Sequence, residues 1–126
     1  MKPTLYPTLE EVLALHSRLI ERFGGSPGVR DLGLIQSGLM RPQSGYYESL
    51  SLEAAALMQS FACNQGFVDG NKRMAFALTA IFLRMNGFQL IVNPDNGESF
   101  LIKSVIGQRV EVKEIALWLE NHINPA

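Results

Sequence analysis

The segment from Asn64 to Arg73 holds the residues of this chain whose types and spacing best suit chemistry on a phosphate group. Gly66 and Gly70 permit positive φ angles and let the backbone approach a ligand closely. Successive N–H groups in such a turn can form a concave anion-binding site. The segment therefore predicts a phosphate-binding loop.

The residues around this loop suit the same chemistry. A helix that begins near Asn71 would present free N–H groups and its positive dipole end to an anion. Lys72 and Arg73 are locally unfavourable cations at a helix start, which a bound polyanion would explain. Asp69 is placed to hold Mg²⁺ between its carboxylate and phosphate oxygens. Phe67 would enter the core and anchor the loop.

A structural interpretation of the same residues stands beside the functional one. Val68 to Asn71 is a good turn sequence by itself, with Asn71 as an ordinary helix cap. Lys72 and Arg73 would then be solvated charges. Residue types alone leave the two interpretations equally open, since a single glycine-rich loop is a weak signal.

Helical periodicity covers most of the remaining chain. The first helix should begin at Thr8, which can form a capping box with Glu11, and should end at Gly24. Asp31 is placed to cap a second helix and Ser51 a third. The segment from Asn71 to Asn86 is apolar on nearly all sides, which predicts a helix at the centre of the core.

The C-terminal third is expected to add a short extended run and two helices. Residues 88–92 form the extended run, a helix follows through Ile106 and stops at Gly107, and the last helix carries Trp118, which is more typical of core than of a groove. The whole pattern predicts one all-α domain over residues 1–126, with about six helices around a central hydrophobic helix and a short β segment.

Composition limits the function classes. Apolar residues make up 47% and charged residues 18% of the 126 residues, as in ordinary globular proteins, and the formal net charge of −1 gives no sign of direct nucleic-acid binding. No apolar run is long enough for a membrane span, and the first residues do not form a signal peptide. We therefore expect a cytoplasmic protein. The single cysteine, Cys63, excludes an internal disulfide and suits a small buried hydrophobe.

Residues 67–73, Phe-Val-Asp-Gly-Asn-Lys-Arg, resemble the core of the signature of the Fic/Doc family, His-Pro-Phe-x-Asp-Gly-Asn-Lys-Arg in the form of its death-on-curing (Doc) branch. The resemblance extends over most of the chain, from Leu15-His16 through residues 23–31 and 41–43 to residues 82–87. It implies the Fic/Doc fold, an all-α bundle.

Two positions of the motif favour the Doc branch. Family members that transfer AMP carry a glycine where this chain has Lys72 and an arginine where it has Phe76. Doc-type proteins are kinases that phosphorylate translation elongation factor Tu, with ATP inverted relative to the AMP-transferring members. The resemblance implies ATP and Mg²⁺ as cofactors, with Asp69 on the metal and Gly70, Asn71, Lys72 and Arg73 on the phosphates.

The catalytic position of the motif departs from the family. The resemblance places the family's histidine, which takes the proton of the attacking hydroxyl, at Gln65. A glutamine amide can orient a hydroxyl but cannot accept its proton near neutral pH. The family's next residue, a proline, is replaced by Gly66, which we expect to loosen the loop. Cys63 stands where Doc-type proteins often have a basic residue.

Three explanations of Gln65 remain open at this point: an engineered or escape substitution, a natural degenerate member that binds without turnover, or another residue serving as base. The two histidines are His16 and His122. We expect His16 to make a structural hydrogen bond and His122 to be solvated.

The resemblance also suggests partners. Doc toxins are neutralised by an antitoxin whose C-terminal segment folds as a helix in a groove. Tyr46 and Tyr47 are candidates for a target-docking flap, or for packing on the domain. Arg30-Asp31 is either an ion pair or a cap preceded by a charge. Nucleotidyl transfer and a non-catalytic nucleotide- or antitoxin-binding module remain the alternative functions.

Overall fold

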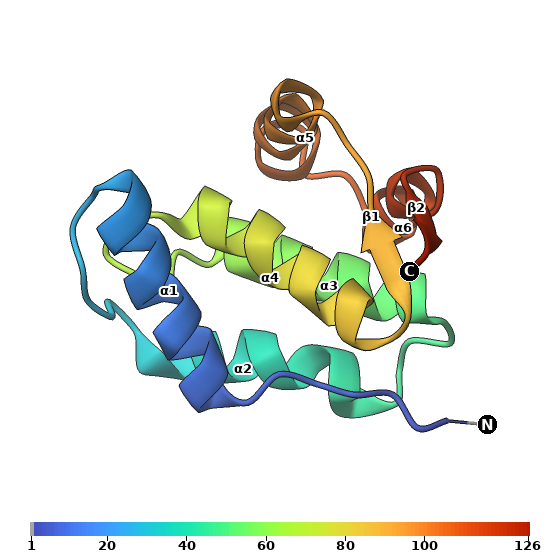
Figure 1. The fold of residues 1–126 in the computed structure, drawn as a ribbon, viewed down its shortest axis with the longest axis horizontal. Helices are drawn as coiled ribbons and strands as arrows, with labels where there is room; N and C mark the ends of the chain where they lie inside the picture. Colours follow the sequence, from blue (N-terminus) through green and yellow to red (C-terminus); the bar gives the residue numbers. More distant parts are fainter. Residues whose placement is uncertain (1) are drawn as a thin grey trace.

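A computed structural model describes residues 2–126 of the chain. The elements, in chain order, are α1 (Leu9–Phe23), α2 (Leu32–Met40), a 3₁₀-helix (Arg41–Ser44), α3 (Leu50–Cys63), α4 (Asn71–Met85), β1 (Phe88–Leu90), α5 (Pro94–Phe100), a π-helix (Leu101–Gly107), α6 (Val112–Glu120) and β2 (Ile123–Pro125). Figure 1 shows α3 and α4 side by side through the middle, with α1 and α2 on one side and α5 and α6 on the other. The all-α prediction is confirmed.

The helix starts test the predicted caps. The Thr8 hydroxyl accepts from the Glu11 N–H at 3.1 Å and the Glu11 carboxylate accepts from the Thr8 N–H at 2.9 Å, so the predicted capping box is present. Asp31 caps α2 by accepting from the Leu34 N–H. The cap predicted at Ser51 is wrong: Ser49 has the extended backbone that a cap needs and accepts from the Leu52 N–H, while Ser51 donates to Glu120 instead.

Helix α3 is the most deeply buried element. Ten of its residues are buried, against six in α4, and it packs on α2, α4, α6 and the π-helix. The helix predicted from Asn71 at the centre of the core shares that place with α3, and α4 leaves Ile81 38% exposed. The alanines of α3, Ala54, Ala55 and Ala56 among them, allow neighbouring helices to approach closely on several sides.

The C-terminal third differs from the predicted pattern in detail. Strand β1 pairs antiparallel with β2, a three-residue strand that contains Pro125 and has no clear hydrophobic alternation. The helix expected to run through Ile106 is α-helical only to Phe100 and continues as the π-helix, which ends at Gly107. Within residues 2–126, no helix combines the length and hydropathy that crossing a bilayer requires.

The connection between α3 and α4, residues 64–70, is held against the segment that leads into α2. The Gly66 carbonyl accepts from the N–H groups of Arg30 at 2.8 Å and Asp31 at 2.9 Å. Val29 forms an antiparallel bridge with Phe67, and the Val68 N–H donates to the Gly28 carbonyl. The expectation that Gly66 would loosen this loop is wrong, because these backbone bonds need no side chain at position 66.

Gly66 is buried, and a Cβ atom built on it would lie 2.6 Å from Cγ1 of Ile35. We therefore expect Gly66→Ala to destabilise the protein by about 1–3 kcal/mol, the usual cost of overpacking a core. Chemical denaturation measures this change in the free energy of unfolding. Gly33→Ala in α2 is the matched control, since its Cβ would meet only the Asp31 side chain, at 3.3 Å. Equal stability of the two variants would contradict the tight contact.

Candidate functional site

Phe67 anchors the connection by entering the core. Its side chain is 1% exposed and its ring stacks on that of His16, with ring centroids 3.8 Å apart. Nε2 of the buried His16 lies 2.8 Å from the Asp69 carbonyl oxygen, so the nitrogen donates to it. The structural hydrogen bond expected of His16 is therefore present, and it ties α1 to the loop.

Asn71 closes the loop around Phe67. The Asn71 side-chain oxygen accepts from the Phe67 N–H and its amide nitrogen donates to the Phe67 carbonyl, each at 3.0 Å. Both functional groups of this side chain are therefore used inside the protein. Its direct contribution toward a ligand is the backbone N–H at the start of α4.

Gly70 turns the chain into α4. Its φ of 77° lies in the left-handed region, where glycine carries no Cβ penalty. The first bond along the helix runs from the Met74 N–H to the Gly70 carbonyl, so the N–H groups of Asn71, Lys72 and Arg73 have no acceptor within the helix. Three backbone donors and the positive helix end thus meet at one point.

Asp69 stands beside these donors. Its carboxylate accepts from the Ser26 N–H at 3.0 Å and from the Gly70 N–H at 2.8 Å. These two hydrogen bonds, with smaller contributions from the charges of His16 and Arg73, hold the pKa of Asp69 below its ordinary value. The group is exposed and ionised at neutral pH, and each oxygen retains a lone pair for a further partner.

Lys72 and Arg73 are exposed on the first turn of α4. The Arg73 guanidinium lies over the Phe23 ring, 4.5 Å from its centroid, which restrains the side chain near the end of α1. Lys72 and Arg73 line the same cavity as Gln65 and Asp69. The structure thus brings together the residues that the sequence singled out between positions 65 and 73.

Gln65 is exposed and has a φ of 52°, a left-handed conformation that is uncommon for a residue with a side chain. Its carbonyl accepts from Nε of Arg30 at 2.6 Å, and the preceding carbonyl, of Asn64, accepts from Nη2 of Arg30 at 3.0 Å. Arg30 therefore binds the C-terminal end of α3, while Asp31 caps α2. The sequence left open whether Arg30 and Asp31 form an ion pair or a helix cap preceded by a charge. It did not indicate that Arg30 fixes the backbone at Gln65.

A cavity of about 880 Å³ opens in front of these groups. Its polar end consists of the loop residues from Gln65 to Arg73. The opposite wall is mainly apolar, with the exposed Glu98 as its one acidic residue among those described. It comes largely from segments that the sequence did not single out, with Leu19, Phe76, Val92, Pro94, Leu101 and Ile106 among its residues. A polar end beside an apolar wall is the usual form of a site for a ligand with one charged and one apolar part.

The aromatic residues considered as a flap lie elsewhere. Tyr46 and Tyr47 precede α3, whose 14 residues span about 21 Å before the loop begins at its other end. Tyr47 is half-buried and accepts from Nε of Arg41, whereas Tyr46 is 80% exposed. Neither lines the 880 Å³ cavity, so a role of these tyrosines in docking a target would act outside it and stays a prediction.

Three other side chains can be placed. Trp118 is half-buried and stacks on Phe100, with ring centroids 4.1 Å apart. The expectation of a solvated His122 is wrong, since its ring stacks on Trp118 and its Nδ1 lies 2.7 Å from the Trp118 carbonyl. Cys63 is half-buried, and burial raises the pKa of its thiol, as fits an unreactive apolar residue.

Residues 6–83 match the model of the Fic/DOC family. The chain belongs to the Fic/Doc family. It is 43% identical over 97 residues to a protein named Toxin Doc from Mycolicibacterium smegmatis, covering 73% of this chain and 72% of that protein. It is 37% identical over 90 residues to Protein kinase doc of Escherichia phage P1, covering 68% of this chain and 71% of the phage protein. The resemblance read from the motif is thereby confirmed.

We expect Asn71→Ala to destabilise this Fic/Doc domain by about 1–3 kcal/mol, because it leaves the Phe67 N–H and carbonyl without their partners. Asn71→Asp should lose less stability than Asn71→Ala, since a carboxylate still accepts from the Phe67 N–H. Chemical denaturation gives the free energies of unfolding. A lower stability of Asn71→Asp than of Asn71→Ala would contradict the bidentate arrangement.

The lowered pKa of Asp69 predicts a pH dependence of stability. The contribution of the ionised Asp69 carboxylate to the free energy of unfolding is fully present above the ordinary aspartate pKa of 3.8. It is lost as the pH falls below that value through the folded-state pKa. A carbon NMR titration of the Asp69 carboxyl should show a midpoint below the ordinary aspartate value of 3.8. Asp69→Asn should flatten the stability profile over the same acidic range. A midpoint at or above 3.8 would contradict the two backbone hydrogen bonds.

Proposed function

We propose that this chain is a Doc-type toxin of a toxin–antitoxin module, built to transfer the γ-phosphoryl group of ATP to a hydroxyl of a translation factor, elongation factor Tu by resemblance. The observation that carries the proposal is the loop of residues 65–73, whose helix-start N–H groups, Lys72 and Arg73 meet at the polar end of the cavity. The names of the two relatives, one a toxin and one a protein kinase, support it. A cytoplasmic location and an antitoxin partner belong to the same proposal.

The residues at the polar end suit the triphosphate. The N–H groups at the start of α4, with the side chains of Lys72 and Arg73, can bind the oxygens of the transferred phosphoryl group. Mg²⁺, when bound, would supply neutralisation of the phosphate charge. Asp69 fits its ligand preference, since it is exposed, ionised and retains free lone pairs. The apolar wall is available to the nucleoside.

The transfer requires the target hydroxyl oxygen to bond to the γ-phosphorus while the bond from that phosphorus to the bridging oxygen breaks and ADP leaves. The hydroxyl proton must go to a base. Gln65 lines the cavity at the position the family motif gives to histidine, and its amide can orient the hydroxyl but cannot take the proton. The proton would then pass to solvent, and turnover should be slow.

Gln65 also supports a second candidate function. With Gln65 at this position, the domain can bind nucleotide or antitoxin without transferring phosphate. Nucleotidyl transfer is less well supported, because Phe76 lies in the apolar wall where AMP-transferring members carry an arginine.

We expect Gln65→His to raise the rate of phosphate transfer by about 10²–10⁴, the usual contribution of general base catalysis. Histidine also tolerates the left-handed backbone at this position better than most residues. The measurement is transfer of label from γ-labelled ATP to elongation factor Tu with Mg²⁺, with mass spectrometry of the product to separate phosphate from AMP.

Gln65→Asn is the matched control, since it keeps an amide and suits the same backbone but supplies no base. Equal activity of the parent chain and Gln65→His would contradict impairment by Gln65. ATP binding by calorimetry with no transfer in either variant would favour the binding module.

A further inference from the structure

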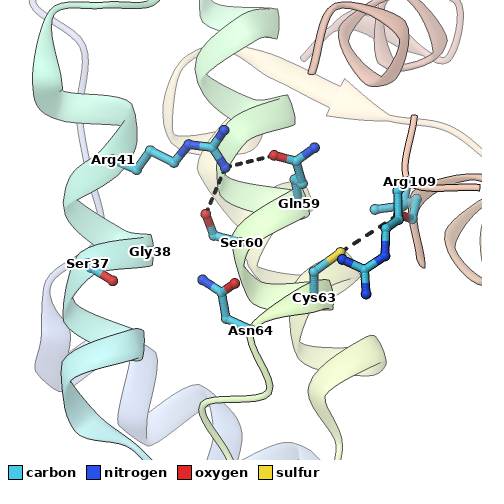
Figure 2. A pocket seen from close by; sticks show the side chains of 9 residues that line it. Ser37, Gly38, Arg41, Gln59, Ser60, Cys63, Asn64 and Arg109 are labelled. Atoms are coloured by element: carbon cyan, nitrogen blue, oxygen red, sulfur yellow. Dashed lines mark hydrogen bonds between the residues drawn. The ribbon is translucent and has the colours of Figure 1, made fainter. Parts of the chain in front are cut away.

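A second cavity, of about 490 Å³, lies between α2, α3 and the segment after the π-helix. Figure 2 shows Arg41, at the start of the 3₁₀-helix that follows α2, on one side of it and Arg109 on the other, with Ser60 of α3 and Asn64 just after α3 also lining it. Two cations line this cavity, and within residues 2–126 no carboxylate does. In a chain of net charge −1, this is a local concentration of positive charge.

Arg41 is held in position by neutral groups. Its Nε donates to the Tyr47 hydroxyl at 2.7 Å, and its Nη1 donates to the side chains of Gln59 at 2.9 Å and Ser60 at 3.0 Å. None of these partners is a carboxylate, so none of them compensates the positive charge of the guanidinium. The side chain is half-buried and already ordered, which reduces the entropy cost of binding an anion.

Arg109 supplies the second charge. It follows the π-helix with a φ of 52°, a left-handed conformation that is unusual for arginine, and its side chain is exposed. Figure 2 shows the Arg109 side chain beside Cys63 at the end of α3, and Arg41 lines the same cavity. The two cations therefore flank one space from different elements.

We propose that this cavity binds a phosphate monoester group, with Arg41 and Arg109 as its cationic contacts and Ser60 and Asn64 as neutral donors. Nε and Nη1 of Arg41 are already used, but its Nη2 has no hydrogen bond within the described residues. Together with the Arg109 guanidinium, a hydroxyl and an amide, it offers more donors than the two oxygens of a carboxylate accept, and these donors match the three terminal oxygens of a phosphate. The site is separate from the loop of residues 65–73, because the two cavities share no lining residue.

An NMR titration of the full chain with inorganic phosphate tests the proposal. The amides of Gly38, Ser60 and Asn64 and the Nε resonances of the two arginines should shift together. Arg109→Gln should weaken phosphate binding at this cavity about tenfold, the loss expected for one charge-assisted contact. Arg18→Gln, which removes an equally exposed cation from α1, should leave the affinity unchanged.

Arg41→Gln is a second variant and should also weaken phosphate binding. Its thermal unfolding must first show that it folds, since Arg41 also links the end of α2 to α3. Shifts confined to residues 69–73, or equal affinities of Arg109→Gln and Arg18→Gln, would overturn the proposal. Acetate binding as tightly as phosphate would overturn the assignment to a phosphate group. Binding of AMP or of phosphoserine more tightly than inorganic phosphate would support the site. The tighter of the two would identify the phosphate as that of a nucleotide or as that of a modified side chain.

Discussion

The structure depends on one constraint: the backbone of residues 64–70 must pair its polar groups while it joins two core helices. Arg30 binds the carbonyls of Asn64 and Gln65, and the N–H groups of residues 30 and 31 bind the carbonyl of Gly66. Asn71 binds both backbone groups of Phe67, and His16 binds the carbonyl of Asp69. Nearly every contact that fixes residues 64–70 therefore comes from outside this segment.

This arrangement separates the groups that hold the loop from those that face the cavity. His16, Arg30 and Asn71 are used for positioning, whereas the N–H groups at the start of α4 and the cations Lys72 and Arg73 stay available. An anion site gains most when its donors are ordered before the ligand arrives, because little reorganisation is then needed. The buried stack of Phe67 on His16 ties this order to the core.

The sequence predicted the parts of the site that lie close together along the chain, together with the helix caps at Thr8 and Asp31. It could not predict contacts between distant segments: Arg30 with the end of α3, the apolar wall from residues 92–106, or the pairing of β2 with β1. It also did not show that α3 shares the centre of the fold with α4, because hydrophobicity on all sides of a helix says less about burial than the small residues that let neighbours pack around α3. Nor could it show that a whole helix separates Tyr46 and Tyr47 from the loop, and their role in docking a target stays a prediction.

Gln65 shows how chemistry and scaffold can vary independently in this fold. Within the described residues, the hydrogen bond that we find for Gln65 uses its backbone carbonyl, and its exposed side chain supports no neighbour. A substitution there can change what position 65 presents to the cavity while the loop, Lys72 and Arg73 stay in place. The reverse holds for Asn71 and Arg30, whose side chains support the loop backbone. The residues that hold the loop are therefore distinct from the residue at position 65, so an exchange at position 65 can be measured for its effect on chemistry without a loss of the loop.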